Sequence, residues 1–181
     1  HETSMNIMAH VGLRFQDQEA LDIFEKHGFL TDGQLVYFQE DQVMRHIKKV
    51  PKTFTLHARN PDRSITIGGE NPVFAPGYGA PFLVDPEKGK RHPTVEDYHN
   101  LVKLAHLLPN QDMTGYLLVE PQDVPSGDAH LYMLLAHMLY SDKSFIGSAE
   151  GAEGARHTLD MVKILFGEDL DQYVTMGLIS A

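Results

Sequence analysis

Eleven histidines are the first residues of this 181-residue sequence to consider for chemistry. His99 and His106 lie seven residues apart in one predicted helix, and His130 and His137 have the same spacing in another. Zinc ligands on a helix usually stand three or four residues apart, because that spacing brings both imidazoles to one ion. The observed spacing favours surface or interface histidines, and we expect no metal site. There is no Cys, so neither a disulfide nor a thiolate site can form.

Three loops that follow short apolar segments carry the other candidates. They cover residues 76–81, 120–125 and 148–154. In parallel α/β folds the reacting groups lie on the loops at the carboxyl ends of the strands. Tyr78 and Glu120 are the first choices, because each lies just after a predicted strand. The full set of candidates on or beside these loops is Phe74, Gly77, Tyr78, Gly79, Phe82, Tyr116, Glu120 and Glu150.

Several of these candidates also have a purely structural interpretation. Phe74 and Phe82 fit core positions better than a binding site. Gly77 and Gly79 permit sharp backbone turns on either side of Tyr78, and a plain tight loop explains them equally well. For Tyr78 itself the structural and the binding interpretations are evenly balanced.

The segment 150–154 precedes a predicted helix, whose N-terminus could bind a substrate carboxylate or a phosphate. Its two glutamates, Glu150 and Glu153, disfavour an anion at this position and can instead cap the helix. The sequence contains no phosphate-binding loop, no dinucleotide-binding glycine pattern and no nucleophile elbow. Nucleotide chemistry and serine hydrolysis therefore find no support in the motifs.

The composition is that of an ordinary globular protein. The chain has 42% hydrophobic and 22% charged residues, with a formal net charge of −10. The densest basic clusters, at 48–52 and 88–91, are short and fit solvated turns, whereas nucleic-acid binding needs a broader basic patch. No apolar run approaches the roughly 20 residues that span a bilayer, and no signal-peptide pattern opens the sequence. We expect a cytoplasmic protein without nucleic-acid or membrane partners.

The first 70 residues predict a small α+β cap. Apolar residues recur at helical spacing in three segments, and two alternating segments around a turn are typical of a β-hairpin. Pro51 prevents the third helix from continuing. The expected elements are helices over 5–11, 18–27 and 41–49, a strand over 35–38, and hairpin strands over 53–58 and 64–67.

Residues 71–181 change to a repeat of strand, loop and helix. Thr94 suits a helix N-cap, and Glu96 and Asp97 place negative charge in the first turn, where it is favoured. The later strands begin about 30 residues apart, an interval typical of a parallel sheet. The expected strands are 73–75, 113–119, 145–147 and 173–179, and the expected helices are 94–108, 128–140 and 152–166.

These repeats predict the N-terminal part of a (β/α)8 TIM barrel, preceded by the cap over residues 1–70. Three complete units and a fourth strand over residues 71–181 are too few for a barrel, which takes about 250 residues. A half barrel would leave strand edges and an apolar inner face uncovered. We therefore expect a missing C-terminal half of the barrel as a partner, and a homo-oligomer. A short, self-sufficient open sheet is the alternative.

Several motifs, taken together, resemble the trimethylamine methyltransferase family. The match runs along nearly the whole chain, in the order and spacing of the family. Each motif alone is weak, whereas the combination is specific. The motifs are TFTLHARNP at 53–61, GYGAPF at 77–82, LVEPQDVP at 118–125, His130 with Leu131, SDK at 141–143, and GSAEGAEGA at 147–155.

The resemblance implies an α/β barrel that removes a methyl group from a methylated or quaternary amine, of the trimethylamine or glycine betaine type. The acceptor would be the cobalt of a separate corrinoid (cobalamin) protein, so we expect no cofactor bound directly to this chain. Such a transfer requires the enzyme to hold the methylated nitrogen in line with the metal, with little acid–base chemistry. Some members contain pyrrolysine and many relatives lack it, and the deciding position lies in the C-terminal half.

A quaternary ammonium ion cannot donate a hydrogen bond, and aromatic faces and carboxylates bind it instead. The resemblance thus implies a substrate site centred on Tyr78 and Glu120, while the catalytic residues stay unassigned. Two other functions remain open. One is a non-catalytic fragment that binds a quaternary amine or a protein, and the other is a barrel hydrolase with a metal held by loop carboxylates and histidines. Rings could come from Phe74, Tyr78, Phe82 and Tyr116, and negative charge from Glu120 or Glu150.

Overall fold

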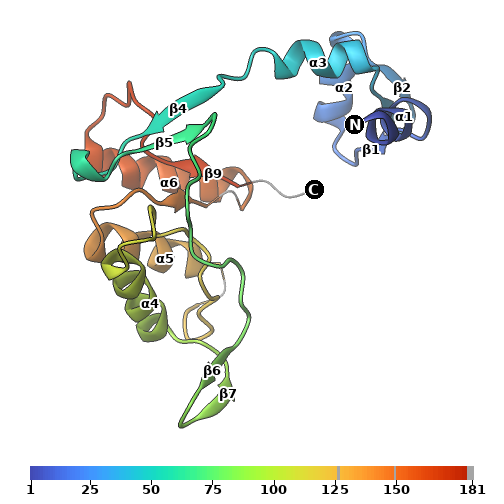
Figure 1. Ribbon diagram of the computed structural model, residues 1–181. Coiled ribbons are helices and arrows are strands. Elements are labelled where there is room, and N and C mark those ends of the chain that lie inside the picture. Colours follow the sequence, from blue (N-terminus) through green and yellow to red (C-terminus); the bar gives the residue numbers. More distant parts are fainter. Residues whose placement is uncertain (126, 149, 179–181) are drawn as a thin grey trace. The chain divides into compact units, whose positions relative to one another are not determined.

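A computed structural model describes residues 1–125, 127–148 and 150–178. The chain divides into two compact units, residues 1–51 and residues 52–181 (Figure 1). Both units mix helices with small sheets, which makes the chain a mixed α/β protein. The described residues form no closed barrel. None of the helices in these residues has the length and apolarity to cross a membrane.

The first unit combines three helices with a three-stranded antiparallel sheet of order β1-β3-β2. The three expected helices are confirmed, and so is the expected strand, β3. Strands β1 and β2 were not predicted, because runs of two or three residues are too short to show an alternating pattern. The elements are α1 (Glu2–His10), β1 (Leu13–Arg14), α2 (Gln18–Lys26), β2 (Leu30–Asp32), β3 (Leu35–Tyr37) and α3 (Glu40–Ile47).

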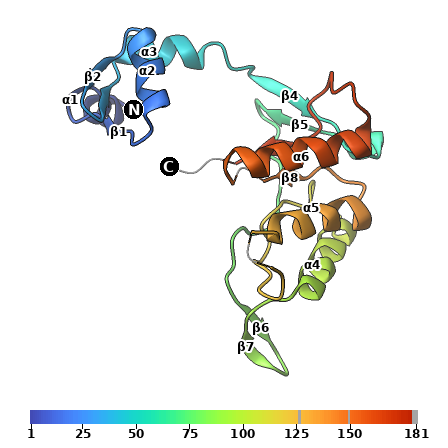
Figure 2. The ribbon, with the colours of Figure 1, turned by 180° about the vertical axis from the view of Figure 1, so that it is seen from behind.

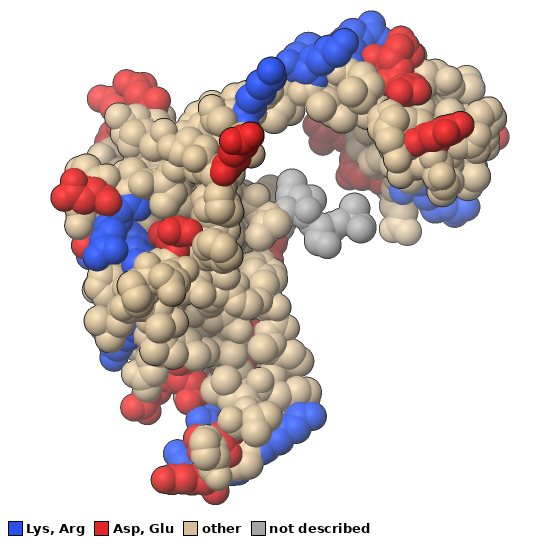
Figure 3. All heavy atoms as spheres, in the orientation of Figure 1, with Lys and Arg blue, Asp and Glu red and all other residues tan. Residues whose placement is uncertain are grey.

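A cluster of partly buried phenylalanines lies beside α2, α3 and the sheet of the first unit. The rings of Phe15, Phe24, Phe29 and Phe38 lie with their centroids between 4.7 and 6.2 Å apart, mostly tilted or edge-on. These are the geometries that aromatic pairs prefer. A row of basic side chains follows α3 into residues 48–52 and is visible at the top of Figure 3, where charges of both signs are otherwise scattered over the surface.

Within the described residues, the second unit contains two hairpins, three α-helices and a parallel pair of short strands. The predicted hairpin near residue 60 is confirmed, with Leu56 opposite Ile65 and Thr53 opposite Gly68. The elements are β4 (Thr53–Leu56), the 3-10 turn η1 (Pro61–Arg63), β5 (Ile65–Gly68), β6 (Leu83–Asp85), β7 (Gly89–Arg91), α4 (Val95–Leu107), α5 (Ala129–Tyr140), β8 (Ile146–Gly147), α6 (Gly151–Phe166) and β9 (Met176–Gly177).

Hydrogen bonds tie the β4–β5 hairpin to distant parts of the second unit. The His57 amide donates to the Tyr173 carbonyl at 2.7 Å, and the Arg59 guanidinium donates to the Met138 carbonyl at 2.8 Å. The Asn60 side chain donates to the Asp142 carboxylate at 3.0 Å. The compact units consequently divide after Pro51, whereas the sequence suggested a cap that extends to residue 70.

Four segments of the second unit lie side by side in chain order and run parallel. The Gly79 amide donates to the Leu117 carbonyl at 2.6 Å, and Ala80 pairs with Val119. Met113 pairs with Ser144, and the Ile146 amide donates to the Gly115 carbonyl at 2.9 Å. Strands β8 and β9 complete the set. This arrangement agrees with a repeating strand–helix order.

Three of the expected strands were wrong in extent or place. The segment 73–75 is not a strand, because Phe74 exchanges backbone hydrogen bonds with Asp112, through its carboxylate and its amide. The segment 113–119 pairs only at isolated points, because Gly115 adopts a positive φ of 74° that bends the backbone. The last strand, β9, is shorter than expected, and residue 179 lies outside the described residues.

Helices α4, α5 and α6 follow the parallel segments, and α5 lies between the other two (Figure 2). The buried face of α4 consists of Tyr98, Val102 and Ala105. The helical spacing of apolar residues would also predict that Leu104, Leu108 and Leu135 are buried, but they lie outside the buried faces of α4 and α5. These three leucines are 42–52% exposed.

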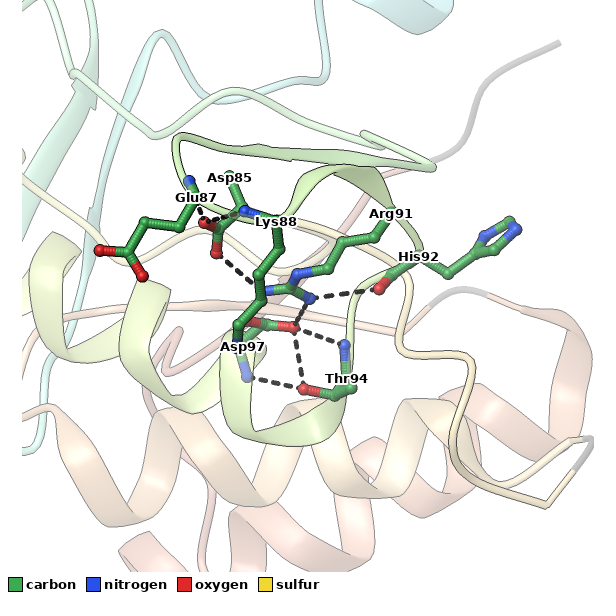
Figure 4. Close-up of polar contacts among 7 residues, drawn as sticks. All are labelled: Asp85, Glu87, Lys88, Arg91, His92, Thr94 and Asp97. Carbon is green, nitrogen blue, oxygen red and sulfur yellow. Dashed lines mark hydrogen bonds and ion pairs between the residues drawn. The ribbon is translucent and has the colours of Figure 1, made fainter.

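Figure 4 shows how the β6–β7 hairpin is joined to the start of α4. The Arg91 guanidinium contacts both carboxylate oxygens of Asp97, at 2.5 and 2.7 Å. Asp97 also accepts from the Thr94 amide at 2.8 Å, while the Thr94 hydroxyl accepts from the Asp97 amide, which is a reciprocal cap. The hydrogen bonds from Arg91 hold the pKa of Asp97 well below its ordinary value, against the opposing effect of burial.

We expect Asp97→Asn to destabilise the protein at neutral pH, by an amount that shrinks in acid. The pKa of Asp97 in the folded state lies below its unfolded value of about 3.9. Its contribution is therefore complete above about pH 4 and is lost as the pH falls toward the folded pKa. Urea unfolding of wild type and variant over this range measures the effect. Asp171→Asn, at an exposed residue, serves as control. A difference in the free energy of unfolding between wild type and Asp97→Asn that does not change with pH would contradict the expectation.

Candidate functional site

Tyr78, Tyr116 and Glu150 lie close together on or just beside three neighbouring parallel segments, with Tyr78 before the paired residues Gly79 and Ala80 and Glu150 after strand β8. Tyr78 directly precedes the backbone bond from Gly79 to Leu117, so its segment lies beside the one that carries Tyr116. Glu150 follows strand β8, which neighbours the same segment on the other side. The negative charge of Glu150 contributes to a raised pKa at both phenols. The structure therefore brings together three of the side chains that the sequence singled out.

Tyr116 is the buried member of this group, with 2% of its surface exposed. Its hydroxyl has no hydrogen-bond partner among the residues that the structure describes. Burial is the main cause that raises the pKa of Tyr116, the nearby Ser148 hydroxyl opposes the rise, and the charge of Glu150 adds to it. A buried, unpartnered hydroxyl costs free energy, which is a common feature of functional sites.

Tyr78 is the open member of the group, since 54% of its surface is exposed. Partial burial raises the pKa of its phenol, and the charge of Glu150 raises it further. Gly79, the residue after Tyr78, has a φ of +76°, which a residue with a side chain rarely adopts. Gly77 has no such conformation and has open space around it. Of the two glycines, Gly79 is the one that the backbone requires.

The position of Glu150 depends on how α6 packs against residues 147 and 148. The Ser148 amide donates to the Thr158 hydroxyl at 3.0 Å, and the Glu150 amide donates to the Ser148 hydroxyl at 3.3 Å. A Cβ atom on Gly154 would lie 2.9 Å from the Ser148 hydroxyl oxygen, so glycine permits this close approach. Within the described residues the Glu150 side chain makes no capping hydrogen bond to α6, so its carboxylate is not used as a cap.

The other predicted residues lie apart from this group. Glu120 is exposed, and its carboxylate has no ion pair or hydrogen bond within the described ranges. The loop of Glu120 is fixed by Asp123, which accepts from the Val95 amide at the start of α4 at 2.8 Å. The Phe74 amide donates to the Asp112 carboxylate. Asp112 lies just before the segment 113–119, which contains Tyr116. Phe82 lies beside β6 and already has a cation over its ring, the Lys90 ammonium group at 4.0 Å.

Comparison with known proteins shows where the chain belongs. The profile described as "Trimethylamine methyltransferase (MTTB)" matches residues 1–180. The chain belongs to the trimethylamine methyltransferase family. The family resemblance noted from the motifs is thereby confirmed.

Individual relatives carry the names of several methyltransferases. The chain is 43% identical over 167 residues to a glycine betaine methyltransferase of Desulfitobacterium hafniense (strain Y51), which covers 92% of this chain and 35% of that protein. It is 29% identical over 189 residues to an L-carnitine:corrinoid methyltransferase of Eubacterium limosum, which covers 96% of this chain and 38% of that protein. It is 27% identical over 173 residues to the trimethylamine methyltransferase MttB of Desulfitobacterium hafniense (strain DSM 10664 / DCB-2), which covers 92% and 34% respectively. The chain spans about a third of the length of these relatives.

Buried polar residues that sequence reasoning missed support the Tyr116 segment of this family member. His130 and His137 were expected at the surface or an interface, and that was wrong, because they are 8% and 1% exposed. His137 contacts Tyr98 and Thr114, while His130 contacts His157 at 2.9 Å. Burial lowers the pKa of His137 to about 4. Among the described residues, no three His, Cys, Asp or Glu side chains gather as a metal ion would require.

We expect Glu150→Gln to lower the pKa of the Tyr78 phenol. The carboxylate charge raises that pKa in the wild type, and an amide of the same size removes the charge without removing the side chain. Ultraviolet absorbance of the phenolate during an alkaline titration measures the change, with Tyr78→Phe to assign the signal. Glu153→Gln, an exposed residue in the first turn of α6, is the matched control. An unchanged Tyr78 titration in Glu150→Gln would show that the two groups are not neighbours.

Proposed function

We propose that the protein moves a methyl group from a methylated or quaternary amine, of the glycine betaine or trimethylamine type, to the cobalt of a cognate corrinoid protein. Family membership supports the reaction class. The single observation that carries the proposal is the meeting of Tyr78, Tyr116 and Glu150 beside neighbouring parallel segments. The names of two relatives, an L-carnitine:corrinoid methyltransferase and a proline betaine:corrinoid methyltransferase, support the choice of partner.

The chemistry of the three side chains fits a methylated ammonium group. Aromatic faces attract such a cation, and a carboxylate complements its charge without the need for a hydrogen-bond donor on the ligand. Tyr78 is exposed enough to meet a ligand, while the burial of Tyr116 excludes water from one side of the site. The corrinoid of the partner supplies the nucleophile that accepts the methyl group. The residues of this chain hold and orient the amine.

We further propose that residues 71–181 supply the first units of a (β/α)8 barrel, and residues 1–70 a cap. The four parallel segments in chain order, the first three of which are followed by the helices α4, α5 and α6, support this architecture. The relatives are about three times as long as the matched region, which leaves room for a C-terminal half. Glu120, Gly77, Gly79 and Phe74 remain proposed contributors at the edge of the site, and the catalytic residues are assigned to that C-terminal half.

Exposed apolar side chains on the helices support the proposal that other parts of the complete protein pack against the second unit. Leu107 on α4, Leu139 on α5 and Ile164 on α6 are 74%, 58% and 87% exposed. Monomeric proteins keep apolar patches small, and larger ones mark contact surfaces. We assign this surface to the rest of the barrel and to a homo-oligomer of a cytoplasmic enzyme. Light scattering of the complete protein tests the oligomer.

The activity test combines the complete protein, a reduced corrinoid protein and a panel of amines. The panel contains glycine betaine, carnitine, proline betaine and trimethylamine. We expect the absorbance change of cobalt methylation with at least one of these amines, and its loss in Glu150→Gln. Amine binding measured by calorimetry without any methylation would favour a non-catalytic binding protein. Neither binding nor methylation with any amine would refute the proposal.

A further inference from the structure

The backbone carbonyl of Tyr116 is held by a side chain rather than by a neighbouring strand. Because Gly115 bends the segment, regular pairing with residues 144–147 ends at the Gly115 carbonyl. The Tyr116 carbonyl instead accepts hydrogen bonds from the Leu118 amide of its own segment, at 2.9 Å, and from the Tyr98 hydroxyl on α4. Breaks of this kind in a strand often redirect a side chain near a functional site.

The Tyr98 hydroxyl belongs to a chain of hydrogen bonds that includes α5. It lies 2.7 Å from His137 Nε2, and His137 Nδ1 lies 2.8 Å from the Thr114 hydroxyl. One arrangement of protons satisfies every atom. Thr114 donates to Nδ1 of His137, the protonated Nε2 donates to the Tyr98 oxygen, and Tyr98 donates to the Tyr116 carbonyl. The other tautomer of His137 would leave the Tyr98 oxygen and that carbonyl in contact with no proton between them.

The three side chains linked by these hydrogen bonds are buried, since Tyr98, His137 and Thr114 are at most 1% exposed. Buried polar groups add little net stability over apolar residues of the same shape, but they fix a geometry, because each donor must meet its acceptor. Two helices thus meet the 113–119 segment at Tyr116, whose own hydroxyl has no partner among the described residues. The hydrogen bonds converge on the backbone of the residue whose side chain reaches the site.

We propose that Tyr98, His137 and Thr114 are positioning residues for the amine site. They hold the carbonyl of Tyr116 and thereby keep its phenol, with the unpartnered hydroxyl, next to Glu150. The ligand-binding part of this inference rests on the proposed function. The positioning itself is a property of the chain and can be measured without a ligand.

The first test follows the Tyr116 ring by fluorine NMR of the complete protein labelled with 3-fluorotyrosine. Tyr116→Phe assigns the resonance. We expect Tyr98→Phe to shift or broaden the Tyr116 resonance. Tyr140→Phe is the matched control, because Tyr140 lies at the end of the neighbouring helix α5 and contacts His99 and Lys103 through its ring. A Tyr116 resonance that is unchanged in folded Tyr98→Phe would overturn the proposal.

The second test measures glycine betaine binding by calorimetry. We expect Tyr98→Phe to weaken binding about tenfold, the effect of about one well-placed hydrogen bond. If Tyr98 acts through Tyr116, the double variant with Tyr116→Phe binds no more weakly than Tyr116→Phe alone. Strictly additive losses would overturn the positioning role.

A third variant and the wild type distinguish a failure of the positioning proposal from misfolding and from a failure of the proposed function. If Tyr98→Phe does not fold, Thr114→Val at the far end of the hydrogen-bond chain replaces it, with a smaller shift of the Tyr116 resonance expected. No shift in that variant would count against the proposal in the same way. Failure of the wild type to bind any amine would refute the proposed function, while the fluorine spectra would still decide the positioning.

Discussion

Lys143→Met should lower the free energy of unfolding by about 3 kcal/mol. The Lys143 ammonium group donates to the carbonyls of Ala105, Leu108 and Gln111, at 3.0, 2.9 and 2.7 Å. These carbonyls lie at and just beyond the C-terminus of α4, where a helix has unpaired acceptors and a cation is favoured. Lys143 is 3% exposed, so water cannot replace the bonds. Met keeps the unbranched apolar part of the side chain but leaves the carbonyls without a donor.

Urea unfolding of Lys143→Met against Lys163→Met tests this expectation. Lys163 on α6 pairs with Glu168 at 3.5 Å, and its side chain is 41% exposed. Exposed ion pairs contribute between zero and about 1 kcal/mol, so this control should change stability little. Similar losses in the two variants would mean that the three carbonyls find other partners, and that Lys143 is an ordinary surface lysine in energetic terms.

The helices could be predicted from the sequence because their signals are local. Thr94 accepts a hydrogen bond from the amide three residues later, as its position before an apolar periodic segment suggested, and Asp17 caps α2 in the same way. The strands depended on contacts and backbone conformations that an apolar pattern does not show. Phe74 is diverted by Asp112, and the Met113–Val119 segment is bent at Gly115, so neither could be recognised from its own apolar pattern.

The candidate site was predictable where it follows the order of the chain. Glu150 follows strand β8, which is where parallel folds place ligands, whereas Tyr78 precedes the paired residues Gly79 and Ala80 and follows no strand. The polar network behind Tyr116 was not predictable, because Tyr98 and His137 are 39 residues apart and on different helices. Their residue types fit a surface as well as a core. The hydrogen bonds that join the β4–β5 hairpin and its loop to Asp142 and Tyr173 are long-range in the same way, and no local pattern predicts them.

Gly147→Ala should lower the free energy of unfolding by about 2–3 kcal/mol, and Thr158→Ser should restore part of the loss. A Cβ atom on Gly147 would lie 2.3 Å from the Thr158 methyl carbon and 3.2 Å from the Thr175 hydroxyl oxygen. Thr158 is β-branched, buried and within α6, so its methyl group has little freedom to move away. The clash also reaches the site, because the Thr158 hydroxyl accepts from the Ser148 amide.

Thr158→Ser removes only the clashing methyl group and keeps the hydroxyl that binds Ser148. We expect Thr158→Ser alone to cost about 1 kcal/mol, and the double variant to be more stable than Gly147→Ala by about the same amount. Gly77→Ala is the control, because Gly77 has no positive φ and no atom within 4 Å of an added Cβ. Additive losses in the double variant would show that α6 does not pack on Gly147 in the way that places Ser148 and Glu150.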